Sequence, residues 1–410
     1  MIPFVNSLSL NLNYKGQSDV IYFDFANAFD SVNHDIILRK LKNMFNIDGL
    51  LLNFVKNYLK DRKQQVTIQN QFSSFAPVIS GVPQGSILGP LLFVLFINDL
   101  CDVLNPETGI YMYADDTKIW RKIDSESDQQ MLQLDINKLY DWSLKNKIRF
   151  HPNKCKVLHV TLKHKPCIFS YYMNGQILES TANERDLGVT VSHNLKWNMH
   201  HNTLLSKTRQ KLGLLKRTCS FSKNPHSRKI LFLSIVRSQF EHCSPVWRPN
   251  KSTQMEKFES IQKRGIKWIL REEYNYYSKL EYYERLKKLD ILPIHLKFNL
   301  NDLTLFHSII YGCSPILLPE YFVSCPNGYL NPDTTGRYFQ RNTRYASSFD
   351  HLMFKSKIIP KIDAFREDFF YRTVDLWNNL PLVIRQIEPE DSFKIKLKEH
   401  LWILAGENFN

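Results

Sequence analysis

The order of apolar and polar residues changes from a mixed pattern to a helical one along the chain. Within residues 20–198, short apolar runs that predict strands alternate with longer segments whose apolar positions recur at helical spacing. Strands are expected at 20–23, 65–68, 75–79, 148–150, 156–161 and 187–191, hairpins at 110–120 and 171–178, and helices at 35–45, 50–59, 87–100 and 127–145. From about 199 to 310 the pattern is helical, and helices including 392–404 end the chain after an irregular stretch.

These elements predict an α+β fold for the first half of the chain, with an antiparallel sheet and packed helices, followed by an all-α region. With 410 residues, the chain is long enough for two or three domains. We expect residual fingers or a polar leader at 1–19, the mixed domain at 20–198, a helical domain at 199–310 and an irregular and helical region at 311–410.

The net charge of +14 is concentrated in one block. Residues 201–300 carry 21 basic and 8 acidic side chains, whereas the other blocks are nearly balanced. Such a block indicates either a site for a polyanion such as nucleic acid or a merely solvated surface.

Cysteine usage and hydropathy limit the cellular compartments in which the protein can work. The seven cysteines form no Cys-x-x-Cys pair and are odd in number, which favours a reduced, intracellular chain without a zinc knuckle. The most apolar run, residues 87–100, is shorter than the roughly 20 residues of a membrane span. The N-terminus shows no signal-peptide pattern. We expect no membrane association, and either the nucleus or a cytoplasmic ribonucleoprotein as the location.

Three carboxylates follow or separate predicted strands. Asp115 and Asp116 lie between two β-prone runs, at the expected tip of a hairpin, and Asp24 ends an apolar strand. The alternatives are ordinary turn chemistry for the pair and a helix N-cap for Asp24. Ionised carboxylates at the ends of buried strands need a compensating positive charge, and Mg²⁺ prefers such oxygen ligands. The sequence therefore predicts a site for two Mg²⁺ ions, which Mn²⁺ can replace.

Three motifs resemble those of a known family. Residues 22–34 (YFDFANAFDSVNH) resemble the first palm motif of reverse transcriptases from non-LTR, LINE-type retrotransposons. Residues 80–90 (SGVPQGSILGP) resemble their second motif, and residues 113–116 (YADD) their third. The likeness extends through 150–155, 187–189 and 244–247 to 376–381, which is typical of jockey-like elements.

The resemblance implies a right-hand polymerase, with a palm and partial fingers at 20–198 and a basic thumb at 199–310. Asp24, Asp115 and Asp116 would bind the metals with help from the Phe25 carbonyl. Phe29 would exclude a ribose 2′-hydroxyl, although an aromatic at this position could equally belong to the core.

The resemblance assigns five further positions. Gln84 and Gly85 would lie against the incoming nucleotide; the alternative is a simple turn before a helix. Lys154 would donate a proton to pyrophosphate, or else be a solvated loop charge. Leu187 and Gly188 would belong to the primer grip.

The basic block would hold the nucleic-acid backbone, so we expect strongly salt-dependent binding. The expected contacts are Lys207, Arg209, Lys211, Lys216, Arg217, Lys263, Arg264 and Lys267. The implied partners are an RNA template, a DNA primer and a deoxynucleoside triphosphate, and the implied reaction is RNA-directed DNA synthesis.

The chain departs from the family pattern at its start. The first palm strand begins near residue 20, so the chain is expected to be N-terminally truncated, without most of the fingers and without a preceding endonuclease. Asn27 replaces a common Lys, and His151 a common Asn. Two hypotheses follow: an active reverse transcriptase, or a catalytically silent remnant that only binds nucleic acid. An unrelated two-metal nuclease is a third.

Overall fold

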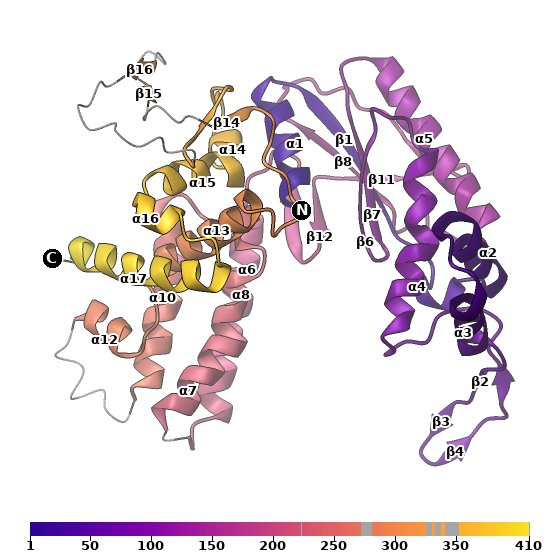
Figure 1. Cartoon of the computed structure of the whole chain (residues 1–410), viewed down its shortest axis with the longest axis horizontal. Coiled ribbons are helices and arrows are strands. Elements are labelled where there is room, and N and C mark those ends of the chain that lie inside the picture. The colour runs from indigo at the N-terminus through magenta and orange to yellow at the C-terminus, as the bar shows by residue number, and fades with distance from the viewer. Residues whose placement is uncertain (223, 272–280, 325–329, 333–337, 341–351, 410) are drawn as a thin grey trace. The chain divides into compact units, whose positions relative to one another are not determined.

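The computed structural model describes the whole chain except residues 223, 272–280, 325–329, 333–337, 341–351 and 410. It divides into two compact units (Figure 1). One unit comprises residues 15–188 and 192–194, and the other comprises residues 1–14, 189–191 and 195–410. Parts of the expected basic helical region and of the expected irregular stretch before residue 350 fall outside the described residues.

The first unit is built on a five-stranded sheet. Its strand order is β11-β8-β1-β7-β6, and every neighbouring pair is antiparallel except β11 and β8. The central strand carries Ile21, which lies opposite Ile119 on one side and Val157 on the other. The strands are β1 (Gln17–Phe23), β6 (Gly109–Tyr113), β7 (Asp116–Lys122), β8 (Lys156–Thr161) and β11 (Glu179–Thr181).

Helices bury this apolar row of the sheet. The core includes Ile21 and Phe23 from the sheet, Phe93 and Phe96 from one helix, and Trp142 from another. Both Phe side chains of α4 are fully buried, because this helix is apolar over nearly its whole length. The helices are α2 (His34–Phe45), α3 (Gly49–Leu59), α4 (Leu88–Ile97) and α5 (Glu126–Lys145), close to the predicted spans. The short 3-10 helix η1 (Phe29–Ser31) lies between β1 and α2.

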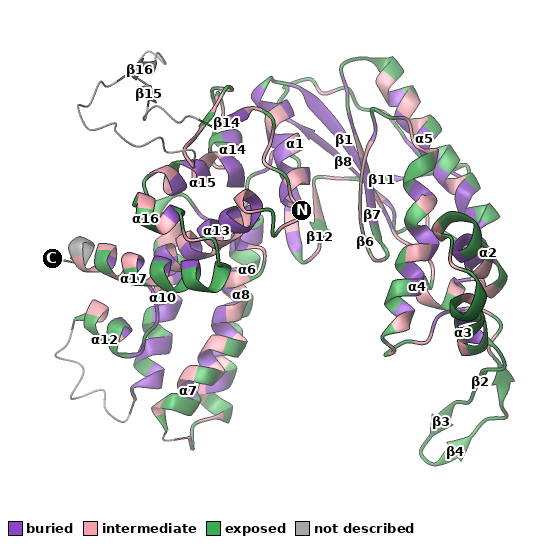
Figure 2. Ribbon diagram, viewed as in Figure 1, coloured by how far each residue is buried: buried purple, intermediate pink, exposed green. Residues whose placement is uncertain are grey.

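The segment between α3 and α4 corrects one prediction. Residues 65–68 and 75–79 do not pair as two continuous strands. Instead β2 (Lys63–Gln64) pairs with β5 (Ala76–Pro77), and β3 (Thr67–Ile68) pairs with β4 (Gln71–Phe72). The reason is a tight turn, since Gln69 and Asn70 both have positive φ and close the inner ladder directly. Figure 2 shows this arm exposed along its length.

Of two other predicted strands, one is wrong and one is shifted by one to two residues. Residues 148–150 form no ladder, and only an isolated bridge joins Phe150 to Phe25. The last of the predicted strands is present as β13, which spans Val189–Ser192 rather than 187–191. Its start is shifted because Leu187 and Gly188 both have positive φ and form the turn that follows β12 (Asn183–Asp186). The Asn174–Gly175 hairpin is confirmed, with β9 (Tyr172–Met173) paired to β10 (Gln176–Ile177).

The second unit is mainly helical. Aromatic side chains fill its interior, with Trp247 stacked on Phe258 and Trp377 against Phe306. The N-terminal segment, for which the sequence predicts residual fingers or a leader and no helix, forms a helix here and packs against two helices from the other end of the chain. The main helices are α1 (Ile2–Asn13), α6 (Asn198–Thr218), α10 (Ser252–Ile269), α13 (Ile294–Ile310), α14 (Asp363–Arg366), α15 (Phe369–Asn378) and α17 (Glu390–Phe409).

Hydrogen bonds from polar side chains of α1 explain its docking. Asn6 donates to Tyr321 Oη at 2.6 Å and to Asp368 Oδ1 at 3.0 Å, and Ser9 donates to Asp368 Oδ2 at 3.3 Å. Leu8 on the same helix is fully buried. The polar residues of α1 therefore do not face solvent as its composition suggests. They form hydrogen bonds to the buried Asp368 and to Tyr321.

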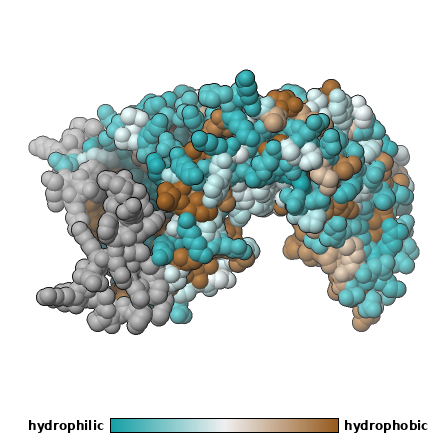
Figure 3. Space-filling model, turned by 90° about the horizontal axis from the view of Figure 1, so that it is seen from above, coloured by the Kyte–Doolittle hydropathy of each residue, from teal (hydrophilic) through white to brown (hydrophobic). Residues whose placement is uncertain are grey.

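The surface is largely hydrophilic. On the face seen in Figure 3, apolar side chains occur in separate small groups among polar ones. Among the described helices, none is long and apolar enough to cross a membrane.

Candidate active site

The pairing of β1 with β7 brings distant carboxylates together. Phe23 is opposite Thr117, so Asp24 and Asp116 are the next residues beyond this pair on adjacent antiparallel strands. Residues opposite each other in such a ladder have Cα atoms about 4.5–5.5 Å apart. Asp115 is the neighbour of Asp116 at the tip of the β6–β7 hairpin. The sheet therefore gathers the three predicted carboxylates at one end.

The hairpin tip is tight. Tyr113 pairs with Asp116, which leaves only Ala114 and Asp115 in the loop. Ala114 has a φ of 51°, a left-handed conformation that side chains other than Gly, Asn and Asp seldom adopt. Asp115 and Asp116 are exposed, so the turn presents both carboxylates to solvent.

The carboxylates share an electrostatic environment. Partial burial raises the pKa of Asp116, and the negative charges of Asp115, Asp186 and Asp24 raise it further, whereas Lys118 opposes the shift. Lys118 forms a buried ion pair with Asp186. Repulsion between clustered carboxylates is the condition that a bound cation relieves.

Lys154 reaches Asp24 from the turn that precedes β8, the strand on the other side of β1. Its Nζ lies 3.5 Å from Asp24 Oδ1, and both side chains are partly exposed. The turn that carries it is fixed, because the His151 N–H donates to the Asp24 carbonyl and the Lys154 N–H donates to the His151 carbonyl. These bonds fix the backbone from which the Lys154 side chain extends towards Asp24.

The predicted nucleotide residues lie on two segments that are bonded to each other. Phe29, in η1, stacks on Phe93 with centroids 4.5 Å apart and stays only partly buried. The Val82 N–H donates to the Phe29 carbonyl, and Gln84 Nε2 donates to Asp30 Oδ1 at 3.2 Å. The first and second motifs therefore form one structural element.

Gly81 makes this junction possible. Its φ is +91°, and a Cβ added there would lie 2.9 Å from the Asp30 Cα. Gly85 also has positive φ, but a Cβ there would meet nothing within 4 Å. Close backbone approach is therefore required at Gly81 and not at Gly85.

A pocket of about 490 Å³ next to Gln84 contains residues that the sequence reasoning missed. Arg62 and Lys63, at the base of the exposed arm, line it together with Asp30 and Gln84. The available signal is the segment from Lys60 to Lys63, which carries three basic side chains between the predicted helix 50–59 and the predicted strand 65–68. Two cations beside the predicted nucleotide residues suit a phosphate-bearing ligand.

The remaining predicted residues are Phe25, which follows Asp24, and residues on the turn after β12 and on α6 and α10. Leu187 and Gly188 form a turn with φ values of 46° and 86°. Phe25 turns its ring into the core, stacked on Phe150 at 4.5 Å. The predicted backbone-binding residues lie on α6 (Lys207, Arg209, Lys211, Lys216, Arg217) and on α10 (Lys263, Arg264, Lys267).

Helices α6 and α10 pack together and concentrate positive charge. Partial burial lowers the pKa of Lys216, and the charges of Arg264 and Lys267 lower it further. Lys263 extends this surface and lies over the Tyr282 ring at 5.1 Å. Three of the eight predicted cations, Lys216, Arg264 and Lys267, are therefore close enough for their charges to repel one another.

Across the described residues, no three His, Cys, Asp or Glu side chains converge closely enough to hold a metal ion by themselves. The carboxylates still suit Mg²⁺, which commonly takes one or two protein carboxylates and completes its shell with water and substrate phosphates. Partial burial raises the pKa of the Asp116 carboxyl, and the negative charges of Asp115, Asp186 and Asp24 raise it further. This repulsion between negative charges is the structural sign that the carboxylates fit a hard cation.

Comparisons with known proteins agree with the motifs. The chain is 27% identical over 242 residues to a probable RNA-directed DNA polymerase from transposon BS of Drosophila melanogaster, covering 57% of this chain and 26% of that protein. It is 28% identical over 199 residues to the RNA-directed DNA polymerase from mobile element jockey of the same species, covering 47% and 21%. The chain thus spans about a quarter of the length of these relatives.

A solved apo telomerase from Candida tropicalis is similar with a TM-score of 0.41 and 12% identity, over 73% of this chain and 49% of that one. The profile of the reverse transcriptase (RNA-dependent DNA polymerase) family matches residues 6–235, more than half of the chain. The resemblance to jockey-like non-LTR elements is confirmed by these matches, and the chain belongs to the reverse transcriptase family.

Proposed function

We propose that this chain carries out RNA-directed DNA synthesis as part of a non-LTR retrotransposon protein. The observation that carries the proposal is the β1–β7 register, in which Asp24 and Asp116 are the residues next to the last pair, Phe23 and Thr117. Gln84 is hydrogen-bonded to Asp30 of η1, and both residues line the pocket that would receive the nucleotide. A protein that only bound metal, or only bound nucleic acid, would not need both the paired carboxylate strands and the contact between η1 and the Gln84 loop.

Reverse transcriptases generally use divalent metal ions, and Asp24, Asp115 and Asp116 are the residues that would hold two Mg²⁺ ions here, with the Phe25 carbonyl. When bound, such ions activate the primer hydroxyl and stabilise the charge of the leaving pyrophosphate. Lys154, whose Nζ lies 3.5 Å from Asp24 Oδ1, would donate a proton to that leaving group.

Other side chains would bind and select the nucleotide. Arg62 and Lys63 would neutralise the triphosphate, and Gln84 would lie against the nucleotide from the loop that Gly81 fixes. Phe29, held against Phe93, would place its ring edge where a ribose 2′-hydroxyl would clash. The preferred substrate is therefore a deoxynucleoside triphosphate.

In this proposal the sheet unit is the palm, and α6 and α10 belong to the thumb. Their lysines and arginines would contact phosphates of the RNA template and DNA primer. The turn at Leu187 and Gly188 would support the primer end. We place this activity inside the cell, in the nucleus or in a cytoplasmic ribonucleoprotein.

Extension of a DNA primer on an RNA template by the purified chain tests the proposal. Asp115→Asn should abolish extension and leave template binding intact, because it removes one negative charge from an exposed turn. Asp141→Asn is the matched control, since Asp141 is an exposed carboxylate on α5. Extension that survives Asp115→Asn contradicts the assignment of the carboxylates.

A catalytically silent remnant is the second candidate. The observation that favours it is that the carboxylates do not converge into a three-ligand cluster within the described residues. Such a remnant would bind primer–template through α6 and α10, but neither the chain nor Asp115→Asn would extend the primer. The same assay therefore separates the two functions.

A further inference from the structure

The turn at Leu187 and Gly188 has a backbone conformation that needs support from its surroundings. The φ of Leu187 is 46° and that of Gly188 is 86°. Glycine adopts such values freely, but a leucine in the left-handed region is unfavourable. A residue of this kind persists where neighbouring contacts hold the backbone in place. Contacts on either side of the turn should therefore fix its position.

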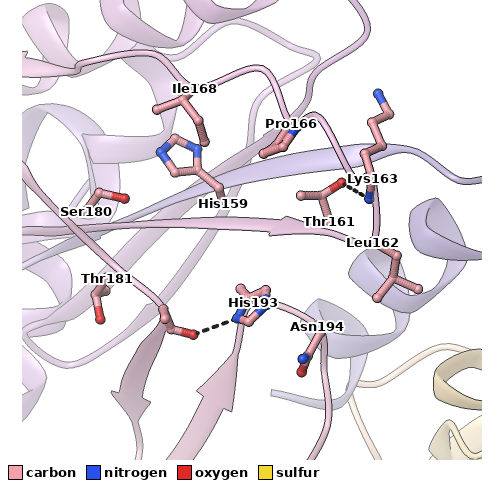
Figure 4. Close-up of a pocket in the computed structure, with 11 residues that line it drawn as sticks. His159, Thr161, Leu162, Lys163, Pro166, Ile168, Ser180, Thr181, His193 and Asn194 are labelled. Atoms are coloured by element: carbon pink, nitrogen blue, oxygen red, sulfur yellow. Dashed lines mark hydrogen bonds between the residues drawn. The ribbon is translucent and has the colours of Figure 1, made fainter.

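Backbone hydrogen bonds fix the open end of the β12–β13 hairpin, which carries this turn. The His193 N–H donates to the Ala182 carbonyl at 2.9 Å, and the Thr161 N–H donates to the His193 carbonyl at 3.0 Å. Figure 4 shows His193 at this open end, with Thr161 at the end of β8. These bonds attach the hairpin to the five-stranded sheet, but the four residues of β12 separate them from the turn.

A buried ion pair holds the other end of β12. Asp186 is the last residue of this strand and directly precedes the turn, and its carboxylate accepts a hydrogen bond from the ammonium of Lys118 on β7. The Asp186 side chain is 3% exposed and the Lys118 side chain 7%. Burying two charges is costly unless they pair closely, so loss of Lys118 would leave a buried carboxylate without this cation. The pair therefore ties the turn to β7.

Strand β7 also carries one of the carboxylates of the candidate active site. Lys118 is two positions after Asp116, so their side chains lie on the same face of the sheet. Burial raises the pKa of Asp116, and the negative charges of Asp115 and Asp186 raise it further. The positive charge of Lys118 opposes this shift. The ion pair thus lies close to Asp116 as well as to the turn, within one compact unit of the chain.

We propose that Lys118 and Asp186 are positioning residues, which set where the Leu187–Gly188 turn lies relative to Asp116. The inference rests on the proposed function, in which this turn supports the primer end and Asp116 helps to bind the metal ions. The pair then sets how far the primer 3′-hydroxyl lies from the reacting phosphate. Both side chains are buried, so they act through the turn and do not contact the substrate themselves.

Removal of both charges tests this role. In a double variant with Lys118→Met and Asp186→Asn, neither buried charge is left without its partner, so the fold should survive. The single-turnover rate of primer extension, at saturating primer–template and deoxynucleoside triphosphate, should fall by about tenfold, because small misplacements of reacting groups are costly. The apparent affinity for the triphosphate should stay within about twofold, since its proposed contacts lie on η1 and the Gln84 loop.

A pair that only stabilises the fold predicts a different result. The double variant would then have a lower denaturant midpoint, while its folded molecules would extend the primer at the native rate. Lys118→Arg keeps the positive charge and can still pair with Asp186, so it should retain most of the native rate.

A second buried pair in the same unit is the matched control. Lys40 on α2 and Asp99 on the 3-10 helix η2 (Asn98–Val103) lie 2.6 Å apart, with side chains 8% and 20% exposed. A double variant with Lys40→Met and Asp99→Asn makes the same chemical change away from the turn. It should lower the denaturant midpoint and leave the single-turnover rate unchanged.

Hydrogen exchange of the turn gives a readout that needs no activity. The amides of residues 186–188 should exchange about tenfold faster in the Lys118 and Asp186 double variant than in the native chain, and at the native rate in the control. If the native chain extends no primer, the proposed function fails, and faster exchange at 186–188 still supports the positioning of the turn. Unchanged exchange at 186–188, or an unchanged extension rate in the double variant, overturns the proposal.

Discussion

Lys154 Nζ lies 3.5 Å from Asp24 Oδ1, although the two residues are 130 positions apart in the chain. The hydrogen bond from the His151 N–H to the Asp24 carbonyl fixes this relationship in the backbone. A lysine so placed can act as a fixed charge or as a proton donor.

Substitution of Lys154 should separate these two roles. If it donates a proton, Lys154→Ala should lower the single-turnover extension rate by about 100-fold, the usual contribution of a general acid. Lys154→Arg should be nearly as slow, because arginine keeps the charge and does not release its proton. Full activity of Lys154→Arg would show that only the charge matters. Lys145→Ala, at an exposed position on α5, should leave the rate unchanged.

Gly81→Ala should damage the junction between the first two motifs. Its Cβ would meet the Asp30 backbone at 2.9 Å, and its φ is +91°, so we expect a stability loss of about 1–3 kcal/mol and reduced nucleotide affinity. Gly85→Ala is the control, because its surroundings are open and only its φ of +77° is unfavourable. Denaturant midpoints and nucleotide KM measure the two effects. Equal losses in both variants would argue against the contact with Asp30.

The carboxylates were predictable because their signals are local. An apolar run ending in Asp24 and a short β-prone hairpin at Asp115 and Asp116 each indicate a position on a strand, and the ladder then brings them together. The core helices were predictable for the same reason, since their apolar periodicity is continuous.

Features that depend on long-range contacts were not predictable. The docking of α1 depends on Asn6 meeting Asp368, 362 positions away, and its composition alone suggests a polar leader. Arg62 and Lys63 reach the Gln84 loop only because β2 pairs with β5. His159 looks like an ordinary strand residue until Asp19 is seen beside its ring.

Nucleic-acid binding should be strongly dependent on salt. Lys216→Ala and Arg264→Ala should each weaken primer–template binding at low salt and reduce the slope of log Kd against log salt by about one. Both residues lie where α6 and α10 concentrate positive charge. Lys251→Ala, an exposed lysine just before α10, is the comparison and should change the slope less. Unchanged slopes in all three variants would contradict a phosphate contact at this surface.

Asp368 should make the docking of α1 dependent on pH. Burial raises the pKa of its carboxyl from 3.8 to about 6, although hydrogen bonds from Phe370 N–H, Asn6 and Ser9 and the charge of Arg372 oppose the shift. The folded state therefore binds this proton more tightly than the unfolded state. Its stabilising contribution is fully present below about pH 4 and is lost as the pH rises through about 6.

The size of this effect has an upper limit of roughly 3 kcal/mol, from the usual 1.36 kcal/mol per pKa unit. Denaturant unfolding and hydrogen exchange of α1 should be compared at pH 4.5 and 7.5 in the native chain and in Asp368→Asn. The native chain should lose stability relative to the variant at the higher pH, because the amide cannot ionise. If both proteins respond to pH in the same way, Asp368 does not titrate between these values, and the charge on this carboxylate must be held by the hydrogen bonds of α1 at both.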